Sequence, residues 1–203
     1  MSAIVYKVKN ALYLNITNRC TNQCAFCIRN KSKVFNQQHP LWLEKEPSAD
    51  ELLQAIGDAS KYQEIVFCGY GEPLIRLDLI KQVASQLKRT SPAVPLRINT
   101  NGQANLFWDR NILPELQGLI DQLSISLDTN NAESYEKLCR PTFGAKSFSA
   151  VIDFARQAKQ YIPKVELSIV DLPAVDTAKA KQIAEELGVG FRVRPYYEEA
   201  YVG

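Results

Sequence analysis

The chain alternates strand-like and helix-like segments with a regular spacing, and this alternation limits its possible folds more than any single motif does. Short apolar, β-rich segments are separated by stretches that carry apolar residues at helical spacing. Strands separated by helices indicate a parallel sheet with right-handed crossover connections. The predicted strands lie at 11–17, 64–71, 95–102, 122–128, 164–170 and 190–197.

The segments between these strands carry helix signals. Ser48 and Glu51 form a capping box, because each side chain can satisfy a free backbone amide of the other residue. Asp176 can cap the last helix, and Gly188 suits the position after its end. The predicted helices lie at 47–60, 77–90, 104–117, 130–139, 147–161 and 177–188.

Two α/β folds remain open from this pattern. The strands read as near-continuous apolar runs, which predicts a sheet covered on both faces. Six strand–helix units are too few for a closed eight-stranded barrel, so a doubly wound sheet or a partial, laterally open barrel would fit. No linker or low-complexity tract interrupts the series, and residues 1–203 are expected to form a single domain.

Polar and glycine-rich residues follow four successive predicted strands. The first strand runs into three cysteines, and the next three run into GYGEP at 69–73, NTNG at 99–102 and SLD at 126–128. Parallel strands place their carboxyl ends at one edge of the sheet, where binding and catalytic groups of α/β proteins collect. The sequence therefore predicts a functional site at this edge.

Cys20, Cys24 and Cys27 crowd into eight positions. A disulfide framework is the poorest explanation, because five cysteines are an odd number and no secretory signal is visible. With no apolar run near the roughly 20 residues that span a bilayer, the protein is expected to be cytoplasmic, with reduced thiols. A zinc site would need a fourth ligand such as His39, whereas an iron–sulfur cluster on three thiolates would keep one iron open.

The charge balance gives no sign of a nucleic-acid binder. The chain has 24 Lys and Arg against 22 Asp and Glu, for a net charge of +2. Its one basic cluster, Arg29, Lys31 and Lys33, is interpreted as a solvated loop.

The pattern Cys20-x3-Cys24-x2-Cys27, with Phe26 before the last cysteine, resembles the radical S-adenosylmethionine (radical SAM) superfamily. GYGEP, NTNG and SISLD at 124–128 are similar to that family's motifs at the ends of its second, third and fourth strands. The resemblance implies a laterally open, partial (β/α)6 TIM-type barrel with a six-stranded parallel sheet. More narrowly, LYLNITNRCTNQCAFCIRN and the short length resemble the small radical SAM proteins associated with TatD-type nucleases.

The resemblance also implies the chemistry. A [4Fe–4S] cluster on the three cysteines would chelate S-adenosylmethionine (SAM) and cleave it reductively to a 5′-deoxyadenosyl radical. That radical would abstract hydrogen from a substrate that the sequence does not identify. A reductant such as flavodoxin or ferredoxin is implied by the electron that the cleavage consumes.

Several residues are expected to bind SAM. Its ammonium group needs acceptors, which Glu72 and the carbonyls of Gly69, Tyr70 and Gly71 can supply. The glycines would let the backbone come close to the cofactor.

Other strand-end residues are expected to face the rest of the cofactor. Ser126 and Thr100 are assigned to its ribose and carboxylate, with Asn99 and Asn101 as second choices.

Three further residues have two interpretations each. Phe26 would pack on the adenine or lie in the core. Arg194 would meet a carboxylate or form a surface salt bridge, and Asp128 would bind the cofactor or brace the following turn.

The remaining cysteines are expected to have separate roles. Cys68, inside a strand, is predicted to be a small buried hydrophobe. Cys139 and Arg140 are candidate catalytic residues that would touch the substrate. Two cysteines cannot ligate a second cubane, so no auxiliary cluster domain is expected. The alternative function is a non-catalytic zinc-binding α/β module that uses the three clustered cysteines and His39.

Overall fold

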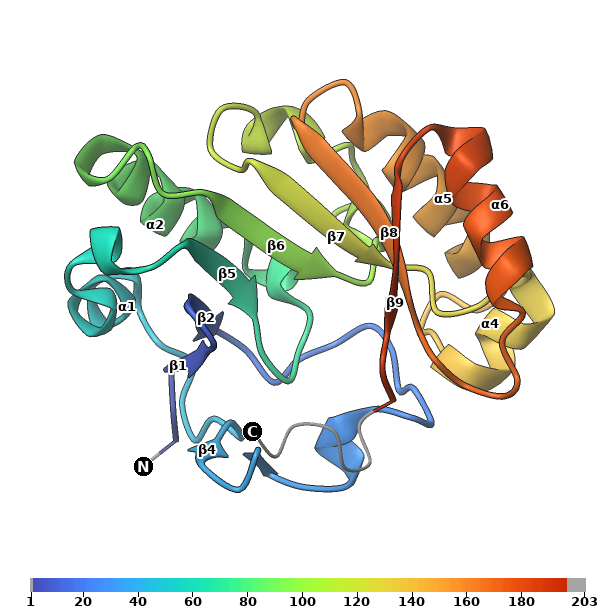
Figure 1. Ribbon diagram of the computed structural model, residues 1–203, viewed down its shortest axis with the longest axis horizontal. Helices are drawn as coiled ribbons and strands as arrows, with labels where there is room; N and C mark the ends of the chain where they lie inside the picture. Colours follow the sequence, from blue (N-terminus) through green and yellow to red (C-terminus); the bar gives the residue numbers. More distant parts are fainter. Residues whose placement is uncertain (1, 197–203) are drawn as a thin grey trace.

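The computed structural model describes residues 2–196, and a seven-stranded sheet forms its centre (Figure 1). The strands lie in the order β1, β2, β5, β6, β7, β8, β9, and all neighbours are parallel except β1 and β2. The strands are β1 (Val5–Val8), β2 (Ala11–Asn15), β5 (Glu64–Cys68), β6 (Leu96–Thr100), β7 (Gln122–Ser126), β8 (Lys164–Val170) and β9 (Gly190–Arg194). The six predicted strands are confirmed, although position 197, the predicted end of the last one, lies outside the described residues.

β1 is the strand that the sequence pattern did not predict. It is antiparallel to β2, and a two-residue turn in which Lys9 has a left-handed backbone (φ 53°) joins the two strands. The turn Lys9–Asn10 lacks the Asn-Gly or Asp-Gly signal of tight hairpins. The central sheet therefore has seven strands instead of the six predicted.

Helices connect the parallel strands. The capping box of α1 is present, with Glu51 N donating to Ser48 Oγ at 3.2 Å and Ser48 N donating to Glu51 Oε2 at 2.7 Å. No described helix is both long and apolar enough to cross a membrane. The α-helices are α1 (Ala49–Ile56), α2 (Leu77–Thr90), α3 (Ala104–Phe107), α4 (Ala132–Cys139), α5 (Lys146–Ala158) and α6 (Thr177–Leu187). The 3₁₀ turns are η1 (Ile28–Asn30), η2 (Ala59–Lys61), η3 (Pro73–Arg76) and η4 (Leu113–Leu116).

The single helix predicted at 104–117 is wrong. α3 ends at Phe107, and Asp109 has a left-handed backbone (φ 49°) that a helix cannot continue through. Asn105 Oδ1 accepts a hydrogen bond from Ile112 N at 3.1 Å. This polar side chain competes with helical hydrogen bonds, which the apolar spacing alone did not reveal.

The apolar core lies between the sheet and the helices. Leu14, Phe67, Ile98, Ile125 and Leu167 are fully buried in it and come from five neighbouring strands. The helices lie around the outer side of the curved sheet (Figure 1) and contribute to the same cluster. Apolar burial of this kind stabilises the fold by about 25 cal/mol per Å².

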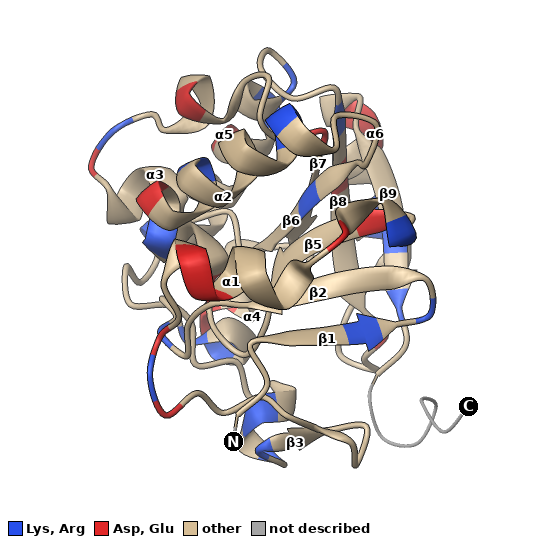
Figure 2. Ribbon diagram, turned by 90° about the vertical axis from the view of Figure 1, so that its left-hand side faces the viewer, with Lys and Arg blue, Asp and Glu red and all other residues tan. Residues whose placement is uncertain are grey.

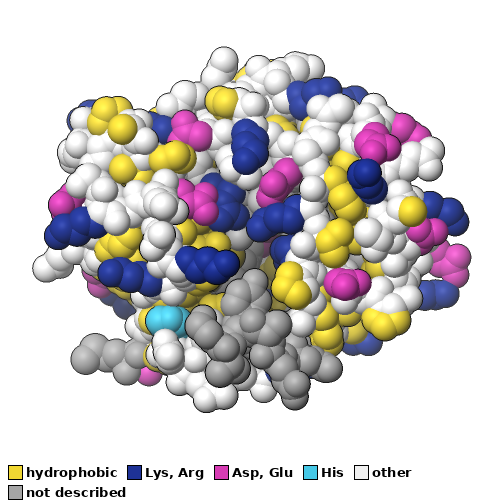
Figure 3. Space-filling model, viewed as in Figure 1, with side chains coloured by type: hydrophobic (Ala, Val, Ile, Leu, Met, Phe, Trp, Pro, Cys, Tyr) yellow, Lys and Arg dark blue, Asp and Glu magenta, His cyan; other side chains and the backbone are white. Residues whose placement is uncertain are grey.

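The opposite face of the sheet is polar. Arg97 of β6 pairs with Glu64 of β5 at 2.7 Å, and Arg192 of β9 pairs with Glu166 of β8 at 3.0 Å. Charged residues occupy β1, β6 and β9 (Figure 2), and charged side chains gather in the middle of the face seen in Figure 3. The prediction of a sheet covered on both faces is therefore wrong, because the described helices pack on one face only.

A small ribbon lies outside this sheet. β3 (Val34–Phe35) and β4 (His39–Pro40) pair with each other in the segment between the cysteines and α1. Next to it, Tyr6, Leu41 and Tyr70 form a second, smaller apolar cluster.

Candidate cluster and cofactor site

The cysteine loop, residues 16–30, follows β2 and packs directly against the GYGEP turn. A Cβ atom on Gly71 would lie 2.4 Å from Arg19 O and 2.5 Å from Thr17 O. A Cβ atom on Gly69, whose φ is 130°, would lie 2.2 Å from Asn15 Oδ1. Both positions need glycine, because the backbone of the cysteine loop blocks a side chain at Gly71 and the Asn15 side chain at the end of β2 blocks one at Gly69. The glycines therefore allow close contact between the turn and the segment that runs from β2 into the cysteine loop, and their approach to a cofactor stays a prediction.

The three clustered cysteines are free and half-buried. Burial, with a smaller contribution from the Glu72 carboxylate, raises the pKa of the Cys20 thiol to about 12, and burial also raises the pKa of Cys27. Within residues 2–196, no three His, Cys, Asp or Glu side chains are spaced to hold a metal ion. The donor set nevertheless fits an iron–sulfur cluster, because one loop supplies three free thiols that ligation would deprotonate. The loop must draw these thiols together around the cluster.

Arg29 holds the cysteine loop from within. Its Nη1 donates to Asn18 O at 3.1 Å and to Tyr70 O at 3.4 Å, and its Nη2 donates to Asn22 O at 3.0 Å. The sequence placed Arg29 in a solvated basic loop, which is wrong, because the guanidinium is half-buried among these carbonyls. No local sequence pattern predicts such a contact, because Tyr70 comes close to Arg29 only in the folded chain.

The cysteine loop is also paired with the end of α4. Asn22 faces Pro141 in an antiparallel bridge, and Ala25 N donates to Leu138 O at 2.8 Å. Cys139, at the last position of α4, is fully buried. A hydrogen bond with the Cys24 thiol, together with burial, raises the pKa of the Cys139 thiol.

Arg140 follows Cys139 as the left-handed C-cap of α4 (φ 45°), and its side chain is exposed. Its carbonyl accepts from Gln23 N at 3.3 Å. Both candidate catalytic residues therefore lie beside the cysteine loop. Their contact with a substrate stays a prediction, and the full burial of Cys139 does not favour it.

Glu72 is buried and its carboxylate is bound by the chain itself. Oε1 accepts from Leu74 N at 3.0 Å and from Thr100 Oγ1 at 2.8 Å, and Oε2 accepts from Asn101 N at 2.6 Å. Burial raises the pKa of Glu72 to about 7, against these hydrogen bonds, which favour the charged form. The side chain ties η3 to the end of β6. Its expected role as an acceptor for SAM stays a prediction.

Asn101 connects β6 to the first cysteine. Its Nδ2 donates to Thr21 Oγ1 at 2.8 Å and lies 3.8 Å from Cys20 Sγ. The structure thus brings Thr100 and Asn101 together with Glu72 and the cysteine loop, as the strand-end motifs predict. Their contacts to SAM stay predictions.

Asn99 and Cys68 meet on the polar face of the sheet. Asn99 Nδ2 donates to Cys68 Sγ at 3.4 Å, and Asn99 Oδ1 accepts from Arg97 Nη1 at 2.5 Å. Cys68 is half-buried with a polar neighbour, so its prediction as a purely hydrophobic core residue is wrong.

A buried polar cluster that the sequence did not predict braces the cysteine loop. Gln103 Nε2 donates to Asn22 Oδ1 at 2.7 Å and to the Tyr135 hydroxyl at 2.9 Å. Asn22 Nδ2 donates to the same hydroxyl at 3.1 Å, and burial raises the pKa of Tyr135 above its usual range. Tyr135 lies on α4, far in sequence from Asn22 and Gln103, so local sequence spacing could not reveal this contact.

Ser126, Asp128 and Arg194 form one group at the carboxyl edge of the parallel strands, which is called the rim below. Arg194 Nη2 donates to Asp128 Oδ1 at 2.7 Å and to Ser126 Oγ at 3.2 Å. Burial raises the pKa of Asp128, although the Arg194 guanidinium opposes the shift. Arg194 thus forms a salt bridge with the buried Asp128 instead of the surface salt bridge that was predicted. Asp128, with φ 55°, binds β9 and not the turn that follows it, so the predicted brace of that turn is wrong and its contact with the cofactor stays a prediction.

Phe26 and His39 lie in different places. Phe26 is half-buried and packs against the main core, while its predicted contact with adenine stays untested. The His39 ring lies 5.6 Å from the Tyr6 ring and 6.4 Å from the Phe35 ring. His39 thus packs among aromatic rings, and its predicted alternative role as a fourth ligand in a Cys3His site stays untested.

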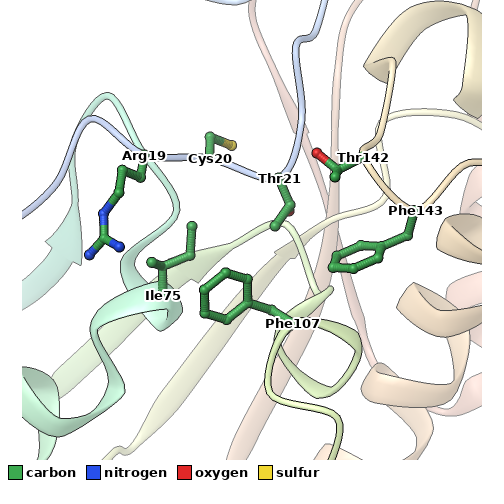
Figure 4. Close-up of a pocket in the computed structure, with 7 residues that line it drawn as sticks. All are labelled: Arg19, Cys20, Thr21, Ile75, Phe107, Thr142 and Phe143. Atoms are coloured by element: carbon green, nitrogen blue, oxygen red, sulfur yellow. The ribbon is translucent and has the colours of Figure 1, made fainter.

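A pocket of about 420 Å³ opens beside the first cysteine (Figure 4). Phe107 and Phe143 contribute aromatic rings to its wall. Its lining residues are Arg19, Cys20, Thr21, Ile75, Phe107, Thr142 and Phe143.

Comparison with known proteins shows the family to which the chain belongs. A family model described as the radical SAM superfamily matches residues 14–187. A GTP 3′,8-cyclase from Lactiplantibacillus plantarum is 30% identical over 159 residues, which cover 77% of this chain and 44% of that protein. Molybdenum cofactor biosynthesis protein 1 from Drosophila melanogaster is 32% identical over 154 residues, covering 76% of this chain and 26% of that protein. The solved structure of SuiB from Streptococcus suis shares the fold, with a TM-score of 0.62 at 16% identity, covering 90% of this chain and 39% of that one.

The chain belongs to the radical SAM superfamily. The class of enzyme and its two cofactors, a [4Fe–4S] cluster and SAM, come with that membership. The chain spans less than half the length of the two curated relatives described above.

Proposed function

We propose that this chain uses Cys20, Cys24 and Cys27 to hold a [4Fe–4S] cluster that cleaves SAM reductively. When bound, the cluster and SAM supply a 5′-deoxyadenosyl radical that abstracts hydrogen from a substrate. The observation that carries the proposal is the position of three free thiols at the carboxyl edge of a mostly parallel sheet, beside the Glu72 motif.

The chain's own residues have defined tasks in this proposal. Arg29 and the contact with α4 hold the backbone of the cysteine loop on both sides of Asn22, while its thiols would turn to ligate iron. Glu72 holds the end of β6 against η3. The rim residues expected to bind SAM are Phe26, Gly69, Tyr70, Gly71, Glu72, Thr100, Asn101, Ser126, Asp128 and Arg194.

The polar face of the sheet supports a substrate site. An open sheet with helices on one face fits a partial (β/α)6 barrel whose inner face carries the charge pairs of β5, β6, β8 and β9. A polar substrate matches this lining better than an apolar one. Because the Lactiplantibacillus relative is named for a reaction on GTP, guanine nucleotides are the first substrates to test.

Two finer proposals rest on the sequence. The stretch LYLNITNRCTNQCAFCIRN supports membership of the small group of radical SAM proteins associated with TatD-type nucleases. The electron requirement supports a cytoplasmic reductant of the flavodoxin or ferredoxin type.

Cluster binding is tested by anaerobic reconstitution with iron and sulfide. The wild-type protein should hold about four irons per chain and absorb visible light. Cys24→Ala should lose most of this iron, whereas the matched control Cys68→Ala should keep it. Colourless wild-type protein that retains one zinc after purification would contradict the proposal.

A further inference from the structure

The one buried thiol of the described chain, Cys139, lies beside Cys24, one of the three proposed cluster ligands. Asn22 and Pro141 form an antiparallel bridge, and Cys24 lies two residues after Asn22 while Cys139 lies two residues before Pro141. The bridge therefore brings the segment that carries Cys24 next to Cys139, the last residue of α4.

Backbone hydrogen bonds hold Gln23 and Ala25, on the two sides of Cys24, against the end of α4. Gln23 N donates to Cys139 O at 3.0 Å and to Arg140 O at 3.3 Å, and Ala25 N donates to Leu138 O at 2.8 Å. Cys24, which lies between these two amide donors, is therefore held against the end of α4, and its thiol is within hydrogen-bonding reach of the Cys139 thiol. Two thiols in direct contact are the starting arrangement that a disulfide requires.

We propose that Cys24 and Cys139 form a disulfide in the cluster-free protein, and that this modification removes Cys24 from the metal-binding set. The bond itself does not depend on the proposed function, but its consequence for cluster loading does. Disulfide and cluster exclude each other, because the same Cys24 sulfur cannot serve both.

A small-molecule disulfide such as glutathione disulfide is the oxidant. The half-buried Cys24 thiolate attacks it, forming a mixed disulfide and releasing one glutathione. Cys139, which is fully buried and adjacent, then displaces the second glutathione. Two protein thiols are oxidised, two glutathione molecules are released, and reduction by excess thiol reverses both steps.

The test uses the full chain stripped of metal by a chelator and equilibrated anaerobically with mixtures of glutathione and glutathione disulfide. Remaining thiols are alkylated, and the cross-linked peptides are identified by mass spectrometry. We expect a Cys24–Cys139 peptide to be the main product in wild-type protein and in Cys68→Ala, and to be absent from Cys139→Ala. Pairing of Cys24 with Cys20 or Cys27, or reduced Cys24 under a large excess of glutathione disulfide, would overturn the proposal.

A second measurement follows iron uptake instead of activity. Oxidised wild-type protein should take up about tenfold less iron than the same protein after reduction, while oxidant-treated Cys139→Ala should show no such loss. The proposed consequence would be contradicted if oxidised wild-type protein that carries the mapped disulfide took up as much iron as the reduced protein. If reduced protein takes up no iron, the proposed function fails, while the disulfide is still judged by the peptide map.

Discussion

At the scale of single residues, Glu72 shows how one side chain can organise the rim. Its two carboxylate oxygens accept from Leu74, Thr100 and Asn101. The sequence indicated that Glu72 belongs to the site, because it follows a predicted strand in GYGEP. The sequence could not indicate that all three hydrogen-bond donors to Glu72 come from the chain itself. Two of them, Thr100 and Asn101, lie at the end of β6 and come near Glu72 only in the folded chain.

Glu72 also predicts a pH dependence of stability. Burial raises its pKa to about 7, above the ordinary 4.5, so the folded state binds this proton more tightly than the unfolded state does. The stabilisation is fully present below about 4.5 and is lost as the pH rises to about 7, by up to about 3 kcal/mol. Urea unfolding should show this loss in wild-type protein relative to Glu72→Gln, which has no such charge to bury. Parallel pH profiles for the two proteins would contradict the prediction.

The roles of Arg194 and Asp128 could be predicted only in part from the sequence. Alternation along a strand placed Ser126 and Asp128 on one face, and Arg194 on the last strand was a candidate salt-bridge partner. The sequence could not decide between a cofactor contact and a brace, because that choice depends on how far apart β7 and β9 lie.

At the scale of elements, the cysteine loop is held by contacts that are distant in sequence. Arg29 reaches carbonyls on Asn18, Asn22 and Tyr70, and the loop pairs with the end of α4. The strands and most helices were predictable, because alternation and capping are local signals. The helix at 104–117 failed on the side chain of Asn105, and β1 was hidden by a turn without a glycine.

Replacing Arg29 tests whether this clamp orders the loop. Arg29→Lys keeps the positive charge, but its ammonium lacks the planar guanidinium that donates to three carbonyls at once. We expect local destabilisation of about 1–3 kcal/mol, seen as roughly tenfold or faster amide hydrogen exchange across residues 18–30. Lys33→Ala is the control, because that side chain lies over the Trp42 ring and is exposed. Unchanged exchange in Arg29→Lys would show that the loop is ordered by other contacts.

At the scale of the whole molecule, the sheet is apolar on one face and polar on the other. Leu14 and Phe67 face the helices, whereas Arg97 and Glu166 face away from them. The sequence suggested two covered faces because its strands are rich in Val, Ile and Leu. Polar residues such as Arg97 and Glu166 lie in the same strands and indicate that one face is polar. Their ion pairs with neighbouring strands, which only the structure shows, identify that face.

The central claim is that this open sheet generates a radical from SAM. The direct measurement is 5′-deoxyadenosine, quantified by mass spectrometry after reduced, reconstituted protein is incubated anaerobically with SAM. Wild-type protein and Cys68→Ala should form it, and Cys24→Ala should not. Wild-type protein that carries a reduced [4Fe–4S] cluster and binds SAM, yet yields no 5′-deoxyadenosine, would contradict the account.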